Sequence, residues 1–252
     1  GKPSNNKVPK KIKDKAIKFY REKLKGFGPT LASEKLLEFE GIEVNDETLR
    51  NWLIETGDWE KLRKSRKHRQ WRERKHHIGE MIQIDGSHHD WFEGRGPKSV
   101  LMGYIDDATN TVHAMFYEYE GTIPAMDSFK RYIRKYGIPV SVYLDKHTTY
   151  KSPAKPSIED EINGTSPMSQ FERALKELGV DVKHAHSPQA KGRIERLFGT
   201  FQDRVVKEMR LAGINTIEQA NRFLQGYLPG YNRRFSVKAK KEDNFHREIP
   251  KG

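Results

Sequence analysis

The sequence contains no cysteine among its 252 residues. A chain without cysteine cannot form disulfide bonds, use a thiol as a nucleophile or build a zinc site that needs a cysteine ligand. Apolar residues are also scarce, at 35%, against roughly 45–50% in an average globular protein. No run approaches the roughly 20 apolar residues of a membrane-spanning helix, and no signal peptide is recognisable. These absences predict a soluble intracellular protein without a membrane partner.

Positive charge is what the sequence has in excess, with 47 Lys and Arg against 35 Asp and Glu and a net charge of +12. The excess is concentrated in residues 1–25 and 61–77, which carry +8 each, whereas residues 26–60 carry −7 and residues 78–252 only +3. Dense basic segments bind polyanions through phosphate contacts that do not depend on base sequence. The charge distribution therefore predicts a nucleic-acid partner.

The basic block at residues 61–77 has only two apolar residues, Leu62 and Trp71, and so lacks a stripe that could pack a helix against a core. It is either a solvated linker or a segment that follows DNA. We favour DNA contact, because like charges at this density repel one another unless a counter-charge is present. The candidate DNA-binding residues of this block are Lys61, Arg63, Lys64, Arg66, Lys67, Arg69, Arg72, Arg74 and Lys75.

The first 60 residues predict a small all-helical domain, because apolar residues recur there at helical spacing. The three segments are residues 12–24, 30–37 and 46–53. Asn45 is suited to cap the third helix, and three short helices with a turn before the last resemble a helix-turn-helix. On the exposed face of the third helix, Arg50 and Asn51 are candidates for reading bases. Two acids on the same face would suit a major groove poorly, so a docking module that does not read bases is an equal alternative.

Beyond residue 80, short apolar runs predict strands in the order β-β-β-α-β-α-β-α. Hairpins join the first three strands and helices join the others, so the later strands run parallel to the first. The predicted fold is an α/β domain with a mixed five-stranded sheet flanked by helices. The predicted organisation is a helical domain at 1–60, a basic linker at 61–77, a catalytic core at 78–235 and a polar C-terminal tail at 236–252.

Three carboxylates stand where such a sheet would hold a ligand. Asp85 and Asp145 each end an apolar strand, and the carboxyl ends of parallel strands meet at the ligand-binding edge of an α/β sheet. Glu195 falls in the first turn of a long helix, off its apolar stripe. Because three converging carboxylates repel one another, they need a cation such as Mg²⁺, which prefers oxygen ligands. Two ions about 4 Å apart would hold the attacking and leaving oxygens of a phosphodiester displacement.

Three segments resemble motifs of the DDE transposase and retroviral-integrase superfamily. They are residues 82–87, 143–146 and 187–196. The last is the most specific, because Ser-Pro-Gln, Lys-Gly and Glu-Arg follow one another there in order. The blocks at residues 85–91 and 105–109 look closest to the ISNCY-like group of bacterial insertion-sequence transposases.

The resemblance implies an RNase H-like core and a DNA transposase that cleaves transposon ends and transfers the freed 3′-OH groups to target DNA. It implies that Asp85, Asp145 and Glu195 are the catalytic ligands of two Mg²⁺ ions, for which Mn²⁺ could substitute. It also implies double-stranded DNA partners, namely terminal inverted repeats and target DNA. A homodimer or higher oligomer on DNA and a cytoplasmic, nucleoid-associated location in bacteria complete the expectation.

The sequence departs from the integrase pattern in two respects. Asp145 and Glu195 are 50 positions apart, which is longer than the integrase-type interval. The excess falls in a loop at residues 146–168, so an insertion explains it without moving the site. The zinc-binding domain of retroviral integrases cannot form without cysteine.

Further residues near these motifs have competing interpretations. Candidate DNA contacts beside the site are Lys146, Lys191, Arg193 and Arg196. Asp106 and Asp107 compete as carboxylates, but turn chemistry before Asn110 accounts for them. His186, just before the Ser-Pro-Gln turn, is the one histidine that deserves notice, although a zinc site without cysteine is the less common outcome. Two other functions stay open: a non-catalytic DNA-binding protein that keeps the fold, and an RNase H-type nuclease of RNA–DNA hybrids.

Overall fold

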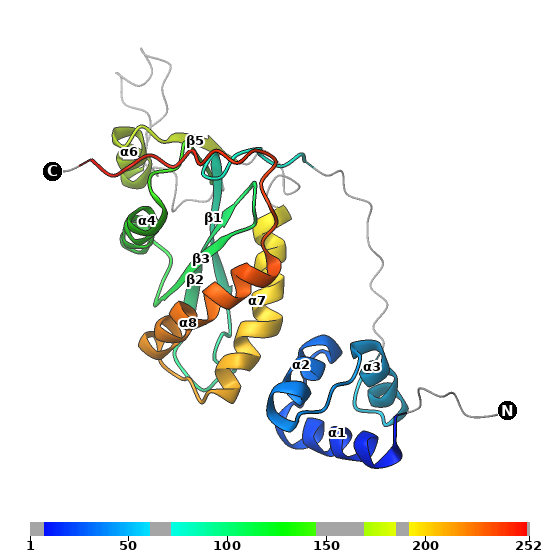
Figure 1. The fold of residues 1–252 in the computed structure, drawn as a ribbon. Helices are drawn as coiled ribbons and strands as arrows, with labels where there is room; N and C mark the ends of the chain where they lie inside the picture. Colours follow the sequence, from blue (N-terminus) through cyan, green and yellow to red (C-terminus); the bar gives the residue numbers. More distant parts are fainter. Residues whose placement is uncertain (1–7, 61–71, 145–168, 185–191, 251–252) are drawn as a thin grey trace. The chain divides into compact units, whose positions relative to one another are not determined.

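The computed structural model describes residues 8–60, 72–144, 169–184 and 192–250. The chain divides into two compact units, Gly1–His68 and Arg69–Gly252, and each unit is considered by itself (Figure 1). None of the helices in these described segments is long and apolar enough to span a membrane.

The N-terminal unit consists of the helices α1 (Lys10–Lys23), α2 (Pro29–Glu40) and α3 (Asp46–Glu55). Gly41 ends α2 in the left-handed conformation, with φ 63°, which favours glycine. Asn45 caps α3 by accepting a backbone hydrogen bond with its side chain. The fully buried core residues of this unit are Ala16, Leu24, Phe27, Ala32, Leu36, Leu49 and Leu53. The three helices expected from apolar periodicity are therefore present.

The second unit is built on a five-stranded sheet in the order β3-β2-β1-β4-β5. The strands are β1 (Met81–His89), β2 (Ser99–Asp106), β3 (Val112–Tyr117), β4 (Ser141–Leu144) and β5 (Asp181–His184). The pairs β1–β2 and β2–β3 are antiparallel, whereas β1–β4 and β4–β5 are parallel. This arrangement confirms the mixed sheet predicted from the order of strands and crossovers.

Helices cover both faces of this sheet (Figure 1). They are α4 (Thr122–Tyr136), α6 (Gln170–Glu177), α7 (Gly192–Leu211) and α8 (Ile217–Phe235). One core cluster joins the sheet to α4 and α6 through residues such as Phe129 and Phe171. The other joins it to α7 and α8 through residues such as Phe201 and Leu224. Because both faces are covered, every residue of the inner strand β2 is buried.

The segment after α8, predicted from its composition as a polar tail, lies along the second unit. Its backbone N–H groups at Lys241, Phe245 and Arg247 donate to carbonyl oxygens that precede β1 and β4. The Phe245 ring also stacks on His77, with centroids 4.0 Å apart. Backbone hydrogen bonds hold this segment in place. The composition did not predict this, because polar side chains do not report where the backbone forms hydrogen bonds.

Candidate active site

Asp85 lies within β1, the central strand, and its side chain faces α7. Successive side chains of a strand point to opposite faces. Ile82 and Ile84 belong to the core cluster on the α4 side, so Gln83, Asp85 and Ser87 point to the other side. The two neighbours of Asp85 on this face both contact α7.

The helix α7 runs beside β1 in the same direction. Near its start, the backbone N–H of Ile194 donates to Gln83 Oε1 at 3.3 Å. Further along, Gln202 Nε2 donates to Ser87 Oγ, also at 3.3 Å. The strand advances about 13 Å between its two contact residues and the helix about 12 Å. Since the two advances match, Asp85 faces the stretch of α7 between Ile194 and Gln202.

Glu195 lies on the side of α7 that faces β1. It is seven residues before Gln202, and residues seven apart in an α-helix lie on one face. Gln202 reaches Ser87 of β1, so Glu195 points to the same side of the sheet. Its side chain is exposed, whereas the buried stripe of α7 includes Leu197 and Phe201. The structure thus brings Asp85 and Glu195 to facing elements.

The position of Asp85 in its strand differs from the expectation that it ends a strand. The strand β1 continues to His89, because its antiparallel partner β2 pairs with it over its whole length. The described pairing with parallel β4 covers Met81 to Gln83. Asp85 therefore lies just beyond the described parallel pairing, although not at the end of β1.

Several predicted site residues lie outside the described residues. They are the third carboxylate Asp145, the DNA-contact candidates Lys61, Arg63, Lys64, Arg66, Lys67, Arg69, Lys146 and Lys191, and His186. Within the described segments no group of three His, Asp or Glu side chains is placed to hold a metal ion. The two predicted ligands that are described offer carboxylate oxygens from a strand and a helix, and such donors fit a hard divalent cation.

Asp106 is explained by its turn. Its carboxylate accepts backbone hydrogen bonds from Gly79, Ala108 and Thr109, at 2.8 to 3.0 Å. Burial raises the pKa of Asp106, and these donors oppose the rise. The prediction that turn chemistry accounts for Asp106 is confirmed.

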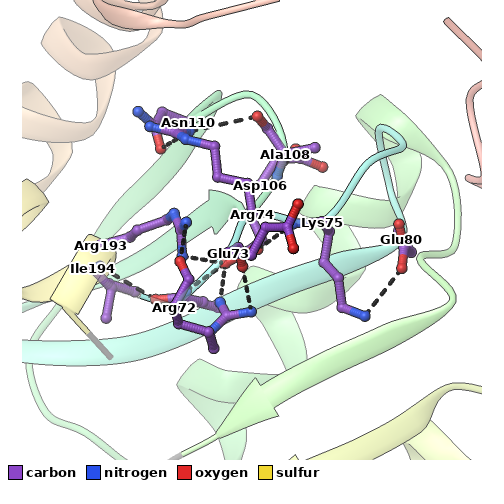
Figure 2. A network of polar contacts seen from close by, with 12 residues as sticks. Arg72, Glu73, Arg74, Lys75, Glu80, Asp106, Ala108, Asn110, Arg193 and Ile194 are labelled. Carbon is purple, nitrogen blue, oxygen red and sulfur yellow. Dashed lines mark hydrogen bonds and ion pairs between the residues drawn. The ribbon is translucent and has the colours of Figure 1, made fainter. Parts of the chain in front are cut away.

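Asp107 does more than the turn requires, which the sequence analysis missed. Its Oδ1 accepts from Gln83 Nε2 at 2.8 Å and pairs with Arg193 Nη1 at 3.0 Å. Its Oδ2 accepts from the backbone N–H of Lys75 at 2.8 Å, and Arg72 pairs with Oδ1. Figure 2 shows the surrounding network, with Arg72, Arg193 and Ile194 close together. One aspartate, Asp106, is enough to form the turn. The presence of a second aspartate beside it was therefore the signal in the sequence that Asp107 has another role.

Three predicted DNA-binding arginines have partners inside this unit. Arg193 is 9% exposed, and its Nη2 donates to the backbone oxygen of Arg72 at 3.1 Å. Burial lowers the pKa of Arg193, while Asp107 opposes this change. The guanidinium of Arg72 lies over the Tyr143 ring, 5.9 Å from its centroid. Arg74 donates to the Asn110 side chain at 2.8 Å. The position of Arg193 thus indicates a structural role and does not favour the predicted DNA contact.

The other described candidates are Arg196, Lys75, Asn51 and Arg50. Arg196, in α7, is exposed. Lys75 pairs with Glu80 at 3.1 Å. In the N-terminal unit, Asn51 is exposed and Arg50 pairs with Glu47 on its own helix.

Comparison with known proteins gives two curated relatives, although no protein-family model matches the chain. The chain is 40% identical over 250 residues to a protein of Sinorhizobium fredii named as a transposase, y4bF, which covers 99% of this chain and 54% of that protein. It is 35% identical over 173 residues to the transposase for insertion sequence IS1202 of Streptococcus pneumoniae, covering 67% of this chain and 36% of that protein. The chain therefore spans about half the length, or less, of these relatives.

Among solved structures, the chain is similar to a chain of the simian T-cell lymphotropic virus intasome in complex with PP2A regulatory subunit B56 gamma. The TM-score is 0.52 at 17% identity, over 86% of this chain and 77% of that chain. At this identity the likeness concerns the fold, and it confirms the predicted RNase H-like sheet with its flanking helices. The chain is thus similar in sequence to transposases of bacterial mobile elements and in fold to a chain of a retroviral intasome. Both likenesses agree with the predicted resemblance to the DDE transposase and retroviral-integrase superfamily.

Proposed function

We propose that this chain is the catalytic part of a DNA transposase that cleaves transposon ends and transfers the resulting 3′-OH groups to target DNA. The observation that carries the proposal is the placement of Asp85 and Glu195 on facing elements. Two hydrogen bonds between β1 and α7, one on either side of Asp85, hold these elements together. Relatives named as transposases support the same reading.

The parallel register of β1 and β4 supports Asp145 as the third carboxylate. Gln83 pairs with Tyr143 in that register. Continued by two residues, the same register would bring position 145 beside Asp85. Three carboxylates would then converge from two strands and one helix.

We propose that these carboxylates hold two Mg²⁺ ions, with Mn²⁺ as a substitute. Bound ions of this kind supply charge stabilisation to the attacking and leaving oxygens of a phosphodiester. The contribution of the chain is geometric: β1 holds Asp85 in the middle of a paired strand, and α7 holds Glu195 in its first turn. Neither carboxylate needs to act as a nucleophile.

We also propose roles for the other parts of the chain, the DNA substrates and the oligomeric state. Residues 1–60 would bind DNA, the basic segment 61–77 would contact the phosphate backbone, and residues 78–235 would form the catalytic core. Terminal inverted repeats and target DNA would be the substrates of a homodimer or higher oligomer, acting on DNA in the bacterial cytoplasm. Among the described candidates beside the site, the exposed position of Arg196 supports a DNA contact.

The decisive experiment is cleavage of a duplex carrying the terminal repeats of the element that encodes this chain, with Mg²⁺ present. Glu195→Gln should reduce cleavage at least about 100-fold, because one charged ligand of the transition-state assembly is lost. Glu218→Gln is the matched control, since Glu218 is also an exposed glutamate in the first turn of a helix, α8. It should cleave as the wild type does.

Cleavage by Glu195→Gln at the wild-type rate would overturn the assignment of the carboxylates. A wild-type protein that binds the duplex but never cuts it would favour the non-catalytic DNA-binding alternative. Faster cleavage of an RNA–DNA hybrid than of the duplex would favour the nuclease.

A further inference from the structure

Three residues that Asp107 and Arg72 contact lie two positions before the three predicted ligands. Gln83 comes two residues before Asp85, and Arg193 comes two residues before Glu195. Tyr143 comes two residues before the third predicted ligand, Asp145. Gln83 and Tyr143 are register partners in β1 and β4. One carboxylate, that of the fully buried Asp107, binds both Gln83 and Arg193.

Arg72 completes this connection. Its guanidinium pairs with Asp107 and lies over the ring of Tyr143. The pair formed by Asp107 and Arg72 therefore touches β1, β4 and α7, the three elements that lead to the predicted ligands.

We propose that Asp107 and Arg72 form a positioning pair that sets β1, β4 and α7 relative to one another. The inference rests on the proposed function, because it concerns the same carboxylates. Asp107 is fully buried and the guanidinium of Arg72 is paired with it, so in this role both act through the residues that they hold.

The effect on Glu195 passes through the amide of Gln83. An ionised carboxylate only accepts hydrogen bonds, so Asp107 forces the Nε2 of Gln83 toward itself. The Oε1 is then turned toward α7, where it accepts from the backbone N–H of Ile194. This N–H is one of the first four in the helix, which have no partner within the helix. Asp107 thus determines how the first turn of α7 is anchored to β1.

A second route from Asp107 to α7 is the guanidinium of Arg193. Its Nη1 pairs with Asp107, and its Nη2 donates to the backbone oxygen of Arg72. Both routes end within two residues of Glu195. Loss of the Asp107 charge would weaken both at once.

The network also ties the basic segment to the site. Arg72 and Lys75 belong to the block at residues 61–77, and both bind Asp107, Arg72 through its side chain and Lys75 through its backbone. The end of the block that enters the catalytic unit is therefore part of the same network as the start of α7. Displacing this end of the block should loosen the first turn of α7.

The test compares Asp107→Asn with Asp106→Asn in the full chain. The two aspartates are adjacent and buried, but the hydrogen bonds of Asp106 go to its own turn and to Gly79. Two readouts are measured beside the melting temperature: hydrogen exchange of the amides in the first turn of α7, and Mn²⁺ affinity by electron paramagnetic resonance of the free ion. Asp107→Asn should accelerate this exchange and weaken Mn²⁺ binding, each at least tenfold. Asp106→Asn should lower the melting temperature without either effect.

Equal changes in the two variants would overturn the positioning role, since they would reflect general loss of stability. If Asp107→Asn does not fold, Arg72→Ala decides, because it leaves Asp107 and Arg193 paired. It should accelerate exchange at Ile194 by a smaller factor, and Arg72→Lys should restore part of the effect. Unchanged exchange in Arg72→Ala would contradict the proposal. A wild type that neither binds Mn²⁺ nor cleaves DNA would refute the proposed function, while the exchange data would still judge the positioning pair.

Discussion

Replacing Gly103 should destabilise the protein, because the absence of a side chain there lets α7 approach the paired strands β1 and β2 at the level of Asp85. Gly103 lies in β2 opposite Asp85. A Cβ atom built on it would lie 2.7 Å from Phe198 Cε1 and 3.0 Å from Cζ. Phe198 belongs to α7 and is 7% exposed, so its ring has little room to move away. Gly103→Ala should therefore push α7 from the sheet at the level of Asp85.

The expected cost is that of overpacking a core, about 1–3 kcal/mol. For a protein of this size, each kcal/mol lowers the melting temperature by about 2–4 °C, so the expected fall is about 2–12 °C. Thermal unfolding followed by circular dichroism measures it. DNA cleavage should fall further than stability explains, because the displaced helix carries Glu195.

Two controls make this prediction specific. Gly199 lies in α7 with no atom within 4 Å of its Cβ position, so Gly199→Ala should stabilise the helix by up to about 1 kcal/mol. In the background of Phe198→Leu, Gly103→Ala should cost less than it does alone, by at least about 0.5 kcal/mol. An unchanged melting temperature in Gly103→Ala, or equal costs in both backgrounds, would refute the reasoning.

Three further predictions concern other parts of the chain. Burial lowers the pKa of His113 to about 4 in the folded protein. As the pH falls, His113 is therefore protonated at a higher pH in the unfolded chain than in the folded protein. Stability should therefore decline from pH 6.5 to pH 4 by about 3 kcal/mol, and His113→Phe should flatten this part of a urea-unfolding series. The side-chain amides of Asn221 and Asn232 bind both backbone groups of Phe116 and of Val112 at the edge strand β3. Replacing either asparagine with alanine should cost about 1–3 kcal/mol in chemical unfolding, and a neutral result would show that water replaces the amide. Replacing Arg63 and Arg66 with alanine should reduce the slope of log affinity for DNA against log salt by about 2; an unchanged slope in a filter-binding titration would contradict phosphate contact.

Local patterns were sufficient for most elements of this protein, although not for the helix α8 (Ile217–Phe235), and for one feature of the site. Apolar periodicity predicted the three N-terminal helices, and strand and turn signals predicted the order of the mixed sheet. The exposed position of Glu195 also followed from helical periodicity, because it is off the apolar stripe of α7. These features depend on residues within a few positions of one another.

Local patterns failed where a residue binds something distant in the chain. Asp107 was expected to serve its turn, yet its partner Arg193 is 86 positions away. Arg193 was expected to contact DNA because it is basic and close to Glu195, yet the structure turns it inward. Periodicity does not report which charge will be buried with which partner, since that choice depends on how separate elements pack.

The sequence by itself determined the types and order of most elements and the concentration of positive charge in residues 1–25 and 61–77. It also predicted the three carboxylates and the resemblance to transposases. The tertiary structure alone decided how the elements come together: β1 with Asp85 beside α7 with Glu195, and Arg72 and Arg193 on Asp107. The physical reason is that periodicity and turn chemistry act over a few residues. The contacts that align a site form only when strands and helices distant in sequence pack against one another.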